Sequence, residues 1–275
     1  MTNNNSLICG ALLILAVGST HAAQAPQSDG VNVGKPSVFR NLVPAGQLEQ
    51  QASSQYSEMM RQAAAQNALA SDGHPQVIRL RAITSRIIPF ATKFNPRANQ
   101  WQWQVNLLGS KQLNAFCMPG GKIAVYSGLL DTLKLTDDEV AIVLAHEIAH
   151  ALREHARERM AKSELTNLGV SLLGQKFGNG NYNSLFQAGG ALLTLKFSRS
   201  DETDADIVGL ELSSRAGYDP RAGITLWRKM TAGSKGAPPQ WLSTHPSGNN
   251  REKEIQQHLP EVMPLYEKAR SGTQQ

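Results

Sequence analysis

The chain has 275 residues, of which 41% are hydrophobic and 18% are charged, so it can build a globular core without additional cross-links. Its length predicts one domain, or one domain with a helical appendage. The net charge of +5 is spread along the sequence, and no block of Lys and Arg with interleaved aromatic residues occurs. That distribution argues against nucleic acid as a partner.

The first residues have the pattern of an export signal. A short apolar run, Leu7–Gly18, precedes Ala22 and Ala23, and cleavage is expected after one of these two small residues. The run is shorter than the roughly 20 apolar residues that a spanning helix needs. We therefore expect 1–23 to be a signal peptide and the mature chain to lie in the bacterial periplasm without a transmembrane domain. An uncleaved anchor is the alternative.

Helices are expected on either side of residue 74. Residues 24–74 form an N-terminal extension in this interpretation, polar at its start and helical over 48–69. Residues 75–88 repeat apolar side chains at helical spacing, and Pro89 is a natural stop.

A β region follows. Apolar and polar residues alternate over 101–107, which predicts a half-buried strand. Two more short strands are expected at 113–118 and 123–126, around a turn at Pro119-Gly120-Gly121, and a short helix at 128–133. Cys117, the one cysteine outside the expected signal, is interpreted as a small core residue.

The stretch that decides the chemistry is His146-Glu147-Ile148-Ala149-His150. Residues four apart share one face of a helix, so His146 and His150 can aim two imidazoles at one Zn²⁺. Glu147 lies beside the first ligand, where its carboxylate can accept a proton from metal-bound water. This is the H-E-x-x-H signature of zinc peptidases. Thr136 and Glu139 predict a capping box at the start of this helix.

An extended substrate needs a strand beside such a helix. In zinc peptidases an edge strand can hydrogen-bond the substrate and hold the scissile carbonyl near the metal. Asn114, Ala115 and Phe116 are the candidate substrate-binding strand. An ordinary hairpin that only packs the core is the alternative.

Catalytic zinc usually has three protein ligands and an open position. His155 does not fit the elongated zinc motif, because Arg153 and Ala156 occupy its glycine and histidine positions. We interpret it as a structural histidine. Glu202 and Asp206 are four apart, so Glu202 can coordinate zinc while Asp206 receives the free N–H of a ligating histidine. Spacing alone leaves a solvated acidic helix start as an equal alternative.

Between these motifs, Arg153–Glu164 predicts an exposed, charged helical continuation. Residues 169–195 are apolar but interrupted by glycines. They predict either one or two mobile helices that cover the cleft as a lid, or plain core helices.

Several motifs occur in a fixed order: Asn114-Ala115-Phe116, Pro119-Gly120-Gly121, Ser127-Gly128-Leu129-Leu130, His146-Glu147-Ile148-Ala149-His150, Ser198-Arg199 with Glu202 and Asp206, and Ser243-Thr244-His245-Pro246. In this order they resemble the gluzincin peptidases of the HtpX, Oma-type and CAAX prenyl endopeptidase family, above all its soluble periplasmic branch, which is similar to the β-barrel assembly-enhancing protease.

The resemblance implies an α+β, mainly α, zincin-like domain over residues 75–260, with a small sheet beside the active-site helix and a C-terminal tail over 261–275. It implies one zinc per chain, with Glu202 as third ligand, Glu147 as general base and Asp206 as a supporting residue. No helical-repeat domain is expected after this region.

His245 is placed near the metal by the same resemblance. It would stabilise the oxyanion, or occupy the open position and keep the enzyme latent, and a loop cap is the alternative. Arg251 follows on an expected helix and is a candidate partner for an acidic site residue.

The expected function is zinc-dependent hydrolysis of peptide bonds. The resemblance suggests unfolded or misassembled envelope proteins as substrates, a role in protein quality control, and the outer-membrane assembly machinery as a partner. The rival hypothesis is a periplasmic chaperone-like binder of outer-membrane proteins with latent peptidase activity.

Overall fold

The computed structural model describes residues 29–172, 192, 195–232, 240–246 and 251–272. The expected signal peptide and most of the expected lid segment lie outside these residues. The described part is mainly helical with one small sheet, which confirms the predicted α+β class. No described helix is both long enough and apolar enough to cross a bilayer.

The helices are α1 (Ala45–Ala65), α2 (Pro75–Ile87), α3 (Ser127–Leu133), α4 (Asp137–Leu152), α5 (His155–Leu172), α8 (Arg199–Arg215), α9 (Ala222–Ala232), α10 (Gln240–Thr244) and α11 (Arg251–Gly272). Three short 3₁₀ helices are η1 (Val38–Leu42), η2 (Ile88–Lys93) and η3 (Pro96–Gln100). The strands are β1 (Gln104–Leu108), β2 (Ala115–Met118) and β3 (Lys122–Tyr126).

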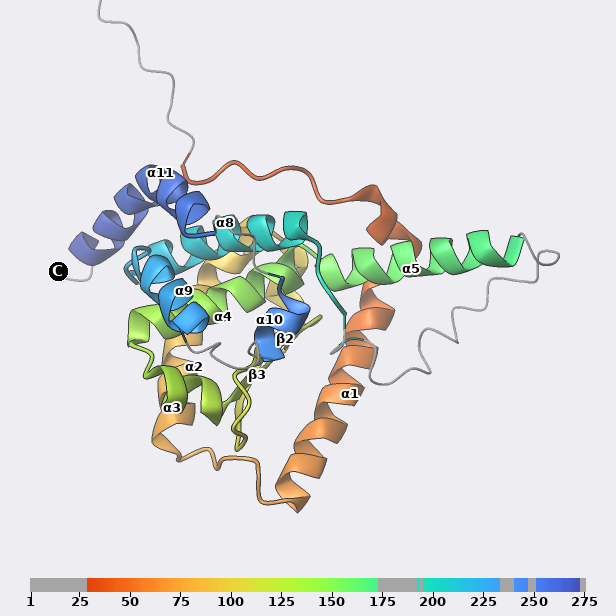
Figure 1. Ribbon diagram of the computed structural model, residues 1–275, viewed down its shortest axis with the longest axis horizontal. Helices are drawn as coiled ribbons and strands as arrows, with labels where there is room; N and C mark the ends of the chain where they lie inside the picture. The colour runs from red at the N-terminus through yellow and green to blue at the C-terminus, as the bar shows by residue number, and fades with distance from the viewer. Residues whose placement is uncertain (1–28, 173–191, 193–194, 233–239, 247–250, 273–275) are drawn as a thin grey trace, which may run out of the picture.

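Helix α4 runs through the middle of the molecule, and α8 lies along it (Figure 1). The predicted capping box begins α4: Thr136 Oγ1 accepts from the N–H of Glu139, and the Glu139 carboxylate accepts from the N–H of Thr136. Every residue of α4 from Glu139 to Leu152 is buried. Gly209 of α8 faces His146, and a Cβ at this glycine would stand 3.0 Å from the His146 backbone nitrogen. The two helices therefore approach as closely as their backbones allow.

The sheet has the order β1-β3-β2. Strand β3 pairs parallel with β1 and antiparallel with β2, so β2 is an edge strand. The turn between β2 and β3 places Gly120 and Gly121 at φ +83° and +77°, a conformation that favours glycine. Helix α4 packs against β2, which sets the free edge of the sheet beside the H-E-x-x-H helix.

The N-terminal strap, residues 29–43, lies across the body ahead of α1. The N–H of Val31 donates to the buried Glu211 carboxylate over 2.7 Å, and η1 packs against α5. Helix α1 buries one side, on which the Tyr56 hydroxyl donates to the carbonyl of Ile123. The described part of the expected N-terminal extension thus packs closely on the body.

One helix boundary differs from expectation. The chain does not continue α4 beyond Leu152, because Glu154 takes a left-handed conformation (φ +58°) and α5 starts anew at His155. Arg153 and His155 are buried at this corner, so the prediction of an exposed continuation was wrong for them. The expected boundary at residue 260 lies inside α11, which runs to Gly272.

Candidate metal centre

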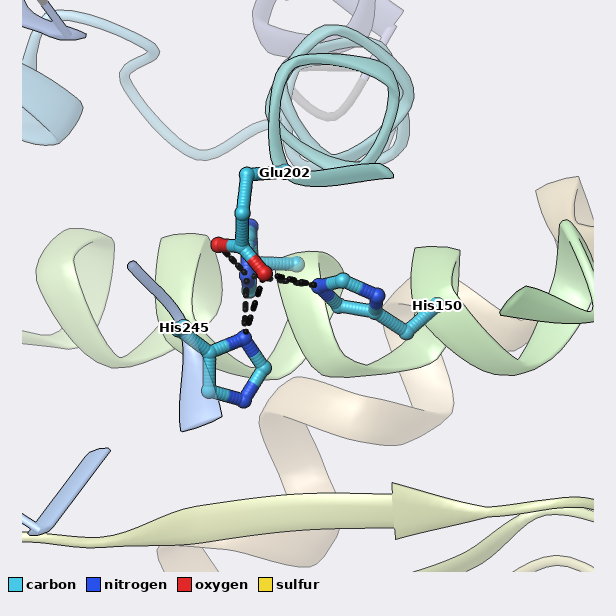
Figure 2. A group of neighbouring side chains, drawn as sticks. His150, Glu202 and His245 are labelled. Atoms are coloured by element: carbon cyan, nitrogen blue, oxygen red, sulfur yellow. Dashed lines mark hydrogen bonds and ion pairs between the residues drawn. The ribbon is translucent and has the colours of Figure 1, made fainter. Parts of the chain in front are cut away.

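Four buried side chains converge at the centre of the molecule. His146 and His150 come from α4, Glu202 from the first turns of α8, and His245 follows α10. One ligand atom of each lies within 4.8 Å of the others. Figure 2 shows Glu202 reaching from α8 toward α4, with the rings of His150 and His245 directed at its carboxylate.

The spacing of these donors fits a zinc ion. His146 Nε2 lies 3.0 Å from His150 Nε2, His150 Nε2 lies 3.4 Å from Glu202 Oε1, and His146 Nε2 lies 3.6 Å from Glu202 Oε2. Donors about 2.0–2.1 Å from a tetrahedral zinc would stand roughly 3.3–3.4 Å apart. Two imidazoles and a carboxylate are also the donor set of catalytic zinc in metallopeptidases. The residues present therefore fit zinc.

His245 adds a fourth donor. Its Nδ1 lies 3.0 Å from Glu202 Oε1 and 3.4 Å from His146 Nε2. The same ring stacks on the indole of Trp241, with centroids 4.7 Å apart and planes at 20°. The ring thus belongs to the donor cluster, where His245 would either complete the ligand set or stand beside the open position.

Asp206 of α8 and Arg251 of α11 contact the metal-site residues and support them. His146 Nδ1 lies 3.0 Å from Asp206 Oδ1, and His146 Nε2 is left to face the other donors. Arg251 donates to both oxygens of Asp206 and, through Nη1, to Glu202 Oε2 at 2.8 Å. Its guanidinium lies 3.9 Å from the Trp227 ring centroid. The buried guanidinium compensates the charges of two buried carboxylates, Asp206 and Glu202. Arg251 thus pairs with acidic residues of the site, as expected from the sequence.

The electrostatics keep the carboxyl groups of the site ionised. Burial alone would raise the pKa of Glu202, but hydrogen bonds from His150 and His245 hold it well below its usual range. Burial likewise opposes ionisation of Asp206, but the charge of Arg251 together with the hydrogen bonds from His146 and Arg251 lowers its pKa. Burial lowers the pKa of His150 well below its usual value, which favours the neutral imidazole that metals bind.

The carboxylate of Glu147 has a partner of its own. Trp241 Nε1 donates to Glu147 Oε1 over 2.6 Å, and His245 Nε2 lies 3.6 Å from the same oxygen. Trp241 lies on α10, and His245 follows directly after this helix; residues 240–245 are called the α10 segment below. The sequence offers no signal for Trp241 beyond its position four residues before His245.

A small cavity of about 70 Å³ adjoins the metal centre. It is lined on one side by Asn114, Ala115 and Phe116, and on the other by Glu147 and His150. The structure thus places the candidate substrate strand at the sheet edge that faces the predicted base. Cys117 is half-buried on the same strand, and burial raises the pKa of its thiol.

All sequence-predicted metal and catalytic residues meet at this one centre, Asp206 and His245 included. His155 also lies there: it contacts His150 from the start of α5. The interpretation of His155 as a structural histidine is compatible with this contact but did not predict it.

A model of peptidase family M48 matches residues 75–259, which is more than half of the sequence. The chain belongs to peptidase family M48. Membership confirms the resemblance seen in the motifs, and it agrees with a zinc site at the M48 H-E-x-x-H helix.

Individual relatives have peptidase names. Mitochondrial metalloendopeptidase OMA1 of Schizosaccharomyces pombe is 36% identical over 191 residues, which cover 69% of this M48 chain and 55% of the yeast protein. Metalloprotease LoiP of Escherichia coli is 29% identical over 153 residues, covering 54% and 60% of the two chains. The beta-barrel assembly-enhancing protease of Yersinia pestis is 28% identical over 172 residues, covering 58% and 35%. The chain spans about half the length of the S. pombe relative.

Proposed function

We propose that this M48 chain is a zinc-dependent endopeptidase. The observation that carries the proposal is the position of Glu147 on the helix that supplies two buried imidazole donors, with the third donor, Glu202, completing a zinc-sized cluster. A purely structural zinc site has no use for an additional carboxylate at this position.

When bound, zinc supplies Lewis-acid chemistry: it lowers the pKa of a coordinated water and polarises a carbonyl. The protein side chains do the rest. The free edge of β2 holds an extended peptide beside the cluster, and Glu147 takes a proton from the attacking water and delivers it to the leaving amine. General acid–base help of this kind contributes roughly 10²–10⁴-fold to the rate. Asp206 and Arg251 keep the His146 ring in place during turnover.

The proposed substrates are unfolded or misassembled envelope proteins, and the proposed place of action is the periplasm. Support comes from the bacterial relatives, one of which is named for β-barrel assembly, and from the signal-like pattern of residues 1–23. A cavity of about 70 Å³ beside a strand edge is also too small for a folded surface, so a substrate would approach it as an extended, unfolded segment. Contact with the outer-membrane assembly machinery is part of the same proposal.

The test compares the protein with its Glu147→Gln variant. Zinc is measured by elemental analysis, and cleavage of unfolded casein is followed with and without chelator. We expect one zinc per chain in both proteins and chelator-sensitive cleavage by the unchanged protein alone. Glu139→Gln is the matched control, because Glu139 is a buried glutamate on the same helix that does not face the cluster. Equal cleavage by the Glu147→Gln variant would refute the mechanism.

A second candidate is a chaperone-like binder with latent peptidase activity. The observation that favours it is the α10 segment, from which Trp241 binds the Glu147 carboxylate and His245 joins the donor cluster. Zinc content without cleavage, together with suppression of aggregation of an unfolded outer-membrane protein, would favour this candidate.

A further inference from the structure

His150 uses its second ring nitrogen to contact another histidine. Its Nδ1 lies 3.0 Å from Nδ1 of His155, and His155 Nε2 lies 3.0 Å from Asp204 Oδ2. The same carboxylate oxygen accepts from Arg153 Nε over 2.5 Å. Three residues outside the metal ligand set thus form a continuous hydrogen-bonded chain that ends on a ligand.

The protons of this chain can be arranged in one way once His150 serves as a ligand. Its Nε2 faces the other donors, so in the neutral ring the proton sits on Nδ1 and is donated to His155. The Nδ1 of His155 must then accept, which leaves its proton on Nε2 for the Asp204 carboxylate. This pair of tautomers gives a partner to Nδ1 of His150 and to both ring nitrogens of His155.

Packing shields the two imidazoles of this chain from water, whereas the Asp204 side chain at its far end is 20% exposed. His155 is 4% exposed, and the Phe197 ring lies against both imidazoles, 4.0 Å from the His150 centroid and 6.3 Å from that of His155. With its neighbours this close, the His155 ring has little freedom to rotate. The contact is therefore a fixed part of the site.

The two α4 ligands are supported in different ways. Asp206 contacts His146 directly. On a helix, Asp204 stands roughly 200° around the axis from Asp206, so the two carboxylates leave α8 on different sides. His155 bridges the remaining gap between Asp204 and His150. The left-handed turn at Glu154 is what brings this histidine back to the end of α4.

We propose that His155 and Asp204 are positioning residues of the metal centre, which fix the ring orientation and the tautomer of His150. Arg153 anchors the Asp204 carboxylate from the other side. This inference rests on the proposed zinc site. It predicts that the affinity of the protein for zinc depends on two residues that do not touch the metal.

The experiment measures zinc affinity, by competition with a chromophoric chelator, and the visible spectrum of the cobalt-substituted protein. We expect His155→Phe to weaken zinc binding about 10–100-fold and to change the cobalt absorption bands. His155→Asn places an amide oxygen near the position of Nδ1, so it should recover most of the affinity. Asp204→Asn, which keeps the shape of the side chain, should weaken binding by a smaller factor and serves if His155→Phe does not fold.

Arg157→Gln is the control for a merely structural role. Arg157 holds the same corner through Val43 and Glu154 but does not contact His150 or His155. We expect it to lower the melting temperature of the zinc-free protein without a change in zinc affinity. The inference would be overturned if His155→Phe left the zinc affinity and the cobalt spectrum unchanged. It would also be overturned if Arg157→Gln lost as much zinc affinity as His155→Phe while the two variants lost the same stability.

Failure of the underlying function gives a different result. If the unchanged protein binds no zinc, the proposed peptidase and this inference fall together. If it binds zinc and cleaves casein while His155→Phe and Asp204→Asn bind zinc equally well, only this inference falls.

Discussion

The indole of Trp241 and the carboxylate of Glu147 are joined by a 2.6 Å hydrogen bond across the metal centre. Trp241 lies on α10, and His245, which stands among the metal donors, follows directly on the same segment. One short segment therefore engages the predicted general base and the fourth donor position together. Displacement of α10 would release both at once.

Removal of this hydrogen bond should activate the enzyme. Trp241→Phe keeps an aromatic ring to stack on His245 but has no donor for Glu147. A hydrogen bond to a charged group is worth about 1.5–3 kcal/mol, so we expect kcat to rise several-fold. Trp103→Phe, which removes an indole that donates only to the Ala98 carbonyl, is the control. Steady-state cleavage of a quenched fluorescent peptide gives kcat for both variants. If kcat fell in Trp241→Phe and not in Trp103→Phe, the indole of Trp241 would assist catalysis instead.

The His245→Ala variant tests whether His245 occupies the open position. We expect zinc affinity to fall modestly, about tenfold, because His146, His150 and Glu202 still provide a complete ligand set. Peptide turnover should rise in the same variant. Retained zinc with a strong loss of turnover would assign His245 to the oxyanion instead. If neither turnover nor zinc affinity changed, both roles would be excluded.

Glu139 should make stability depend on pH. Burial would raise the pKa of this carboxyl, but hydrogen bonds from Lys229, from the Thr136 backbone and from Thr225 lower it below its usual value of 4.5. A lowered folded-state pKa stabilises the fold above the unfolded-state pKa, and this contribution is lost as the pH falls through the folded-state pKa. Glu139→Gln should therefore cost about 1–3 kcal/mol at pH 7.

Urea unfolding at pH 7 and below pH 4 measures this effect. The difference in unfolding free energy between the unchanged protein and Glu139→Gln should shrink as the pH falls from about 5. The exposed Glu58, changed to Gln, should show almost no difference at either pH. A Glu139→Gln penalty that stayed constant down to pH 3 would contradict the assignment.

Gly209 should tolerate no side chain. An alanine Cβ would press on the backbone of His146 at 3.0 Å and force α8 away from α4. Overpacking costs about 1–3 kcal/mol, which outweighs the roughly 0.5–1 kcal/mol that alanine gains over glycine within a helix. We expect lower stability together with weaker zinc binding. In the control Gly223→Ala the new methyl meets side chains alone, Ile255 at 3.3 Å and Leu210 at 3.6 Å, and zinc affinity should not change.

The parts of the fold that depend on local pattern could be predicted from sequence. The capping box of α4 and the four-residue spacings of His146 with His150 and of Glu202 with Asp206 follow directly from helix geometry. The contacts of His155 could not be foreseen, because they depend on a left-handed turn at Glu154, a residue type that does not signal one. The bond between Trp241 and Glu147 joins segments 94 residues apart, and no periodicity records such a pairing.

The side chain of Glu211 is completely buried in α8, where it is paired with Lys93 and Arg215 and accepts from the N–H of Val31, 180 residues away. Such distant closures make folding slow, since loop entropy is lost before the contact forms. Until the strap arrives, the helix that carries Glu202 has an incompletely satisfied charge at its centre. Docking of the N-terminal strap and completion of the helix that carries Glu202 are therefore linked through one buried carboxylate.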